Sequence, residues 1–136
     1  MTRKTDAPPS TPSLQALPTG FTRFRERVQQ RMAQDPMAYG RFTRAYVAST
    51  FDECLGDVPA PSARCLAPDE AWVGVRRQWL QDCLAAHPEE SRDQRLSASR
   101  HVADGFRVHA ALDRLPDGAS TTRVLDALLE MTRPTA

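Results

Sequence analysis

The chain has 136 residues, of which 40% are hydrophobic and 26% are charged, and its formal net charge at pH 7 is +1. This length predicts one domain whose apolar residues can build a core, which excludes a requirement for disulfide or metal cross-links. The small net charge excludes a partner that is attracted by the field of the whole molecule.

Residues 1–18 hold four prolines among serines and threonines, which predicts a disordered Pro-rich tail ahead of a single helical domain at 19–136. The tail has no apolar run, so it predicts neither a signal peptide nor an anchor. No window elsewhere reaches the roughly 18 apolar residues of a membrane-spanning helix. We therefore expect a cytoplasmic protein with reduced thiols and no membrane partner.

Residues 19–34 repeat apolar side chains at helical spacing, at Phe21, Phe24, Val28 and Met32. The stripe is narrow and arginines border it on both sides. A second helix is predicted from Asp35, as N-cap, and Pro36, as first helical residue, to Leu55, with Gly56 as its C-cap. This helix has two apolar faces, which is typical of a central helix or of one that also contacts a second molecule.

The stretch 68–87 carries both tryptophans, Trp72 and Trp79, on one broad apolar face of a third predicted helix. We expect both to anchor the core. Arg76 lies between them on the same face. It is expected to pair with a carboxylate, Glu53 or Asp113, because an unpaired buried charge is costly, and it can also stack on an indole. The functional alternative is that Arg76 points at a phosphate in a groove.

Another helical run is predicted over 88–115, and a last helix, capped by Ser120 or Thr121, follows the turn at 116–118. This last helix is predicted to have one apolar face, formed by Val124, Leu125, Leu128, Leu129 and Met131. No stretch shows the alternation of a strand. The predicted fold is all-α: a small bundle of about four to five helices.

The most distinctive surface feature is a strip of arginines and aromatic residues in the first third of the chain. Seventeen of the 18 basic side chains are arginines, whose planar guanidinium groups bind carboxylate or phosphate in two places. The candidate binding residues for nucleic acid or a protein partner are Arg23, Arg25, Arg27, Arg31, Arg41, Arg44, Tyr39, Phe42 and Tyr46.

From this strip we predict a non-catalytic accessory subunit or adaptor of a macromolecular complex that contacts nucleic acid. The alternative is a pure protein–protein interaction module that binds a protein partner or self-associates. No P-loop, nucleophile elbow or convergent acid–base set occurs, so we predict neither an enzyme nor a small-molecule substrate.

A third hypothesis is a helical protein stabilised by zinc. Cys83 and His87 are one helical turn apart, and Cys54 and Cys65 would complete a tetrahedral set. The sequence lacks the paired-cysteine knuckle of common zinc sites, and Cys83 lies on the apolar face, where a thiol packs as a small hydrophobic group. The favoured prediction is therefore no cofactor.

Overall fold

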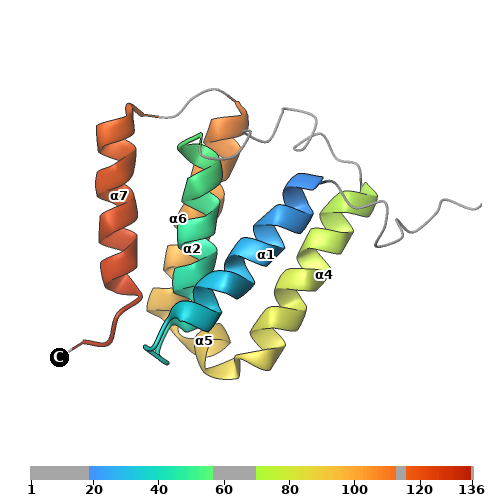
Figure 1. Cartoon of the computed structure of the whole chain (residues 1–136), viewed down its shortest axis with the longest axis vertical. Helices are drawn as coiled ribbons and strands as arrows, with labels where there is room; N and C mark the ends of the chain where they lie inside the picture. The colour runs from blue at the N-terminus through green and yellow to red at the C-terminus, as the bar shows by residue number, and fades with distance from the viewer. Residues whose placement is uncertain (1–18, 57–69, 113–115, 136) are drawn as a thin grey trace, which may run out of the picture.

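The computed structural model describes residues 19–56, 70–112 and 116–135, and these ranges form six α-helices and no strand (Figure 1). The helices are α1 Thr19–Gln34, α2 Arg41–Cys54, α4 Glu70–Ala86, α5 Pro88–Arg92, α6 Gln94–Ala111 and α7 Gly118–Met131. The all-α prediction is confirmed. The predicted tail at 1–18 and the connection at 57–69 lie outside the described residues.

Helix α2 occupies the centre of the bundle. It packs on α6 behind it, on α1 at one side and on α7 at the other, and α4 lies beyond α1 (Figure 1). Phe42, Ala45 and Tyr46 join one apolar cluster, whereas Val47 and Phe51 join a second. Both predicted apolar faces therefore contribute to the core, although Leu55 at the end of the second face is 39% exposed.

The first cluster holds α1 and α4 against α2. Phe24 and Val28 of α1 are buried in it, as their spacing predicts. The ring of Trp79 lies 5.6 Å from Phe24 and 6.3 Å from Tyr46, centroid to centroid. Its expected role as a core anchor is confirmed, and the side chain of Trp72 lies outside the described part.

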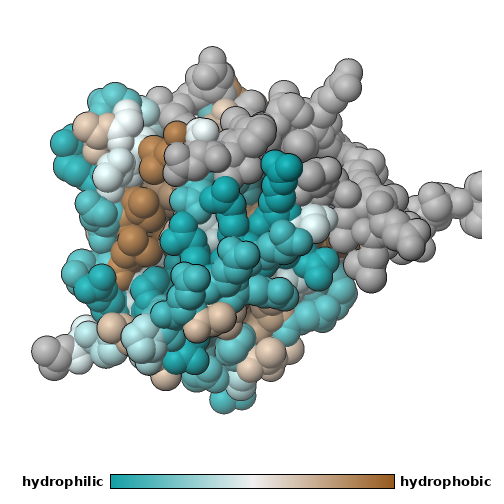
Figure 2. Space-filling model, in the orientation of Figure 1, coloured by the Kyte–Doolittle hydropathy of each residue, from teal (hydrophilic) through white to brown (hydrophobic). Residues whose placement is uncertain are grey.

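The second cluster attaches α7. Leu128 is buried against α2 and α6, and the half-buried side chains of α7 surround it: Val124, Leu125, Leu129 and Met131. The face predicted for the last helix is thus confirmed. Apolar surface remains visible along α7 on the side that faces α2 (Figure 2).

The predicted start of α2 is wrong by five residues. Asp35 closes a turn by accepting a hydrogen bond from the Met37 N–H at 2.9 Å, and the helix begins only at Arg41, after Gly40 with φ 70°. Its first N–H groups are satisfied by a residue distant in the sequence. Both carboxylate oxygens of Glu90, which is 1% exposed, accept from Phe42 N at 2.9 Å and from Thr43 N at 2.8 Å. The helix ends at Cys54 with Leu55 as its C-cap, one residue earlier than predicted, and Gly56 follows with φ 85°.

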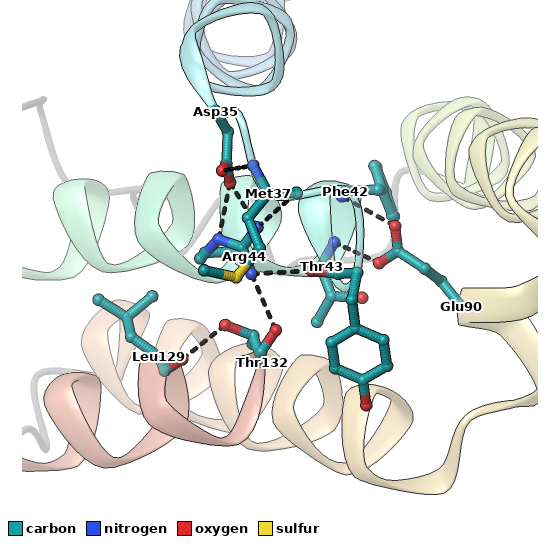
Figure 3. Close-up of polar contacts among 9 residues, drawn as sticks. Asp35, Met37, Phe42, Thr43, Arg44, Glu90, Leu129 and Thr132 are labelled. Carbon is teal, nitrogen blue, oxygen red and sulfur yellow. Dashed lines mark hydrogen bonds and ion pairs between the residues drawn. The ribbon is translucent and has the colours of Figure 1, made fainter. Parts of the chain in front are cut away.

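Arg44 ties this turn to the end of α7 (Figure 3). Its guanidinium pairs with Asp35 at 2.6 Å and donates to the carbonyls of Tyr39, Met37 and Thr132 at 3.0, 2.9 and 2.8 Å. A charge with this many partners is well compensated. It therefore fixes the α1–α2 turn to the C-terminal end of α7.

Two other helix boundaries differ from the prediction. The run over 88–115 breaks at Asp93, whose side chain accepts from Arg95 N and Leu96 N and so caps α6 as a separate helix. Helix α7 is capped by Asp117, which accepts from Ser120 N at 2.8 Å, rather than by Ser120 or Thr121. In both helices the N-cap is an aspartate, because its carboxylate accepts from the free N–H groups of the first turn and interacts favourably with the positive end of the helix dipole.

Candidate functional site

The outward side of α6 is an uncharged stripe. From Arg95 onward, and leaving out Ala111, whose side chain is outside the described part, every exposed residue of this helix and its C-cap lies on it: Ala98, His101, Val102, Gly105, Val108, His109 and Leu112. Their spacing alternates between three and four residues over two heptads, the pattern of a seam that meets another helix. Leu112 is 51% exposed, and Val102 and Val108 are each 41% exposed. We call these seven residues the α6 stripe.

Charged residues of α6 lie on its inward side instead. Arg100 is buried and donates to the Thr43 hydroxyl at 2.6 Å. Asp104 accepts from the Tyr46 hydroxyl. Burial raises the pKa of Tyr46 well above its ordinary value, so this hydroxyl remains a donor at neutral pH.

Arg76 of α4 and Arg107 of α6 converge near Tyr46 and Glu53 of α2. The Arg76 guanidinium lies 4.6 Å from the centre of the Phe24 ring, so its cation–π contact is with Phe24 and not with a tryptophan as predicted. Burial lowers the pKa of Arg107, and the charge of Arg76 lowers it further. Burial raises the pKa of Glu53 despite both arginines. We call Arg76, Arg107 and Glu53 the buried charge cluster; the other carboxylate proposed for Arg76, Asp113, lies outside the described residues.

The cluster holds guanidinium atoms without hydrogen-bond partners. Nη2 of Arg76 and Nε of Arg107 are both buried and have no acceptor among the described residues. In that part of the chain no ion pair within 4.0 Å joins either arginine to Glu53 or Asp104; the pairs present are Arg27–Asp52, Arg31–Asp52, Arg44–Asp35 and His87–Glu89. These two donor atoms therefore remain unsatisfied by the described residues.

The arginines of the predicted strip make different kinds of contact in the structure. On α1, Arg27 and Arg31 pair with Asp52 of α2 at 3.0 and 2.7 Å, Arg25 lies 5.7 Å from the centre of the Phe21 ring, and Arg23 is exposed. The pairs with Asp52 hold α1 on α2. These two arginines, which we predicted to contact the phosphates of a nucleic acid, are therefore already paired within the chain.

The α2 members and their neighbour Tyr39 are mostly inside the molecule. Phe42 and Tyr46 are 0% and 2% exposed and belong to the core, and the Tyr39 hydroxyl donates to Asp93 at 2.6 Å. Arg44 is bound in the junction described above, and Arg41 is partly exposed. The structure thus does not bring the nine residues together on one exposed surface, and their binding role stays a prediction.

The predicted zinc ligands are likewise not assembled. Cys65 lies outside the described residues, Cys54 ends α2, and Cys83 lies in the last turn of α4, which runs antiparallel to α2 (Figure 1). Burial raises the pKa of Cys54 to about 11, which opposes the thiolate that zinc requires. In the described ranges the residues close enough to share a metal are His87, Glu89 and Glu90, and Glu90 is already committed to the α2 N–H groups. Zinc binding therefore stays a prediction without support in this geometry.

Sequence reasoning missed the α6 stripe, and of the buried charge cluster it associated Arg76 with Glu53 but missed Arg107. The stripe has a local signal, because Ala98, Gly105 and Leu112 recur every seven residues and their exposed neighbours carry no formal charge. Arg107 has no such signal, because a helical pattern does not tell which arginines point inward. No helix in the described part of the chain is both long enough and apolar enough to cross a membrane.

A comparison with protein families identifies the fold. The family model described as tetracyclin repressor-like, C-terminal domain, matches residues 40–133, more than half of the chain, whereas no curated protein and no solved structure matches. Such domains bind ligands and dimerise in transcriptional regulators. The prediction of an accessory subunit that contacts nucleic acid through the arginine strip is therefore wrong, and neither the protein-module nor the zinc alternative describes this family better. The self-association that we predicted agrees with the dimers typical of the family. The predicted absence of a small-molecule ligand has no support in this family. The chain belongs to the family of tetracyclin repressor-like C-terminal domains.

Proposed function

We propose that this chain is the ligand-binding and dimerisation domain of a cytoplasmic transcriptional regulator and catalyses no reaction. The observation that carries the proposal is the α6 stripe. Homodimer interfaces are depleted of charge at their centre, and the stripe has none in a chain of which 26% is charged. A two-fold axis through the stripe would pack the helix on its own copy.

The residue sizes along the stripe support this arrangement. Ala98 and Gly105 allow two helix backbones to approach closely, while Val102, Val108 and Leu112 supply apolar area to bury. An alternation of three and four residues suits two helices that cross at about 20°. In this proposal any effect on DNA depends on the dimer and its ligand, not on the arginines of α1.

The test is the mass of the chain in solution, measured by sedimentation equilibrium. We expect twice the chain mass of 15.1 kDa for the wild type at about 10 μM. The variants Val102→Glu and Val108→Glu should be monomers, because each places two like charges near the axis. The matched control is Gln81→Glu, at an exposed position of α4, which should remain a dimer. A monomeric wild type, or stripe variants that dimerise normally, would contradict the proposal.

A further inference from the structure

We infer that the ligand of this domain is an organic carboxylate with an apolar body, whose carboxylate binds Arg76 and Arg107 where α2, α4 and α6 meet. The inference rests on the proposed function, because it specifies the ligand of the proposed ligand-binding domain. It adds a chemical class and two binding residues that the family match does not supply.

The unpaired guanidinium atoms are the first argument. Arg76 Nη2 and Arg107 Nε are buried, and neither has an acceptor within the described ranges. A buried charged donor without a partner is costly, and native proteins satisfy nearly all such groups. A carboxylate offers two oxygens with several lone pairs, so it can accept from two guanidinium groups at once.

The electrostatics of the site point the same way. Two arginines close enough for the charge of one to lower the pKa of the other repel each other. Glu53 offsets this repulsion incompletely, because burial raises its pKa and so favours its neutral form. Asp104 is engaged with the Tyr46 hydroxyl. An added anion would relieve the repulsion and restore charge balance.

The apolar body is inferred from the surroundings of Arg76. One face of its guanidinium is covered by the Phe24 ring, and Phe24 packs edge-on against Trp79. Trp79 is only partly buried and is joined by Phe21 at 5.9 Å. Arg76 therefore lies among aromatic side chains, of which Trp79 and Phe21 are partly exposed, and such surroundings favour an alkyl or aryl acid over a small inorganic anion.

The experiment is calorimetric titration of the full chain with three acids and their neutral amides: acetate and acetamide, benzoate and benzamide, octanoate and octanamide. We expect benzoate or octanoate to bind with a Kd below about 1 mM. The corresponding amide should bind more weakly by a factor of roughly ten or more. Acetate, which lacks the apolar body, should bind weakly. Equal binding of an acid and its amide, or no binding by any acid, would overturn the inference.

Titrations of arginine variants test whether Arg76 and Arg107 bind the acid. Arg76→Gln and Arg107→Gln should each weaken the acid by roughly tenfold or more, whereas Arg77→Gln, at the exposed neighbouring position, should not. Arg76→Lys and Arg107→Lys keep the charge and remain informative if a glutamine variant loses helicity; each should bind more weakly than wild type, because lysine lacks the planar fork. Unchanged binding in the folded variants would overturn the assignment.

Failure of this inference is distinguishable from failure of the proposed function. Tight binding of the neutral amides would leave a ligand-binding domain in place and remove only the anionic class. The mass of the chain, measured in the same samples, reports dimerisation whatever the acids do.

Discussion

Gly40 provides the sharpest test of the junction between the α1–α2 turn and the end of α7. Its φ of 70° lies in the left-handed region, and a Cβ added there would lie 2.3 Å from the carbonyl oxygen of Thr132. The same oxygen accepts a hydrogen bond from Arg44 at 2.8 Å. Gly40→Ala therefore strains the backbone and also displaces a carbonyl that holds α7.

The expected loss follows from these two effects. A left-handed conformation costs an alanine about 1–2 kcal/mol, and loss of the buried hydrogen bond from a charged donor costs about 1–3 kcal/mol. We expect Gly40→Ala to lower the free energy of unfolding by about 2–5 kcal/mol. Urea unfolding, followed by helical circular dichroism and tryptophan fluorescence, measures this difference.

The chain offers two matched controls. Gly56 has φ 85°, but an added Cβ there meets nothing within 4 Å, so Gly56→Ala should lose only the conformational part, about 1–2 kcal/mol. Gly74 lies in α4 with the same open surroundings, and Gly74→Ala should stabilise the protein by about 0.5–1 kcal/mol. If Gly40→Ala were no more destabilising than Gly56→Ala, the argument from the Thr132 contact would be refuted.

Two further predictions concern carboxylates. Glu90→Gln replaces an acceptor of two backbone N–H groups by a side chain that has donors of its own, so we expect the free energy of unfolding in urea to fall by about 2–3 kcal/mol. The control is Glu89→Gln: the Glu89 side chain is 70% exposed, so this variant should change stability by less than about 0.5 kcal/mol. Equal effects of the two substitutions would contradict the capping role of Glu90. Burial raises the pKa of Asp35, but the Met37 N–H and Arg44 lower it more, so its net pKa lies below the ordinary 3.8. The ionised carboxylate therefore stabilises the fold above pH 3.8, and this gain is lost as the pH falls through the folded pKa. The urea midpoint of Asp35→Asn should depend less on pH between about 2 and 5 than that of the wild type, and an unchanged pH profile would contradict the pair of Asp35 with Arg44.

Features set by neighbouring residues could be predicted from the sequence. Three such features are the spacing of Phe24 and Val28, the apolar face of the last helix, and the glycine that follows the C-cap of α2. Each depends on residues within a few positions of one another. Helical periodicity and turn chemistry act at that range. The all-α class and most of the core follow from them.

Features set by distant residues could not be predicted. The start of α2 depends on Glu90, 48 residues along the chain from Phe42, and a local reading therefore assigned the cap to Asp35. Arg44 looked like part of a basic strip because its carbonyl partner at Thr132 is 88 residues away. For the same reason, the convergence of Arg76 with Arg107 is visible only after α4 and α6 are placed.

The two proposals meet on α6, because this helix reverses the usual distribution of side chains. It turns Arg100, Asp104 and Arg107 toward the bundle, and it leaves Val102, Val108 and Leu112 outside. Burying charge is unfavourable, and so is exposing aliphatic area, at about 25 cal/mol for each Å². Both costs are offset if a second α6 covers the outer side and an anion binds the inner one. In an isolated, ligand-free chain, Thr43 and Tyr46 satisfy Arg100 and Asp104, but Arg107 Nε stays without an acceptor among the described residues and the apolar side stays exposed. The placement of Arg107 and of the three aliphatic residues therefore favours the dimeric, liganded state.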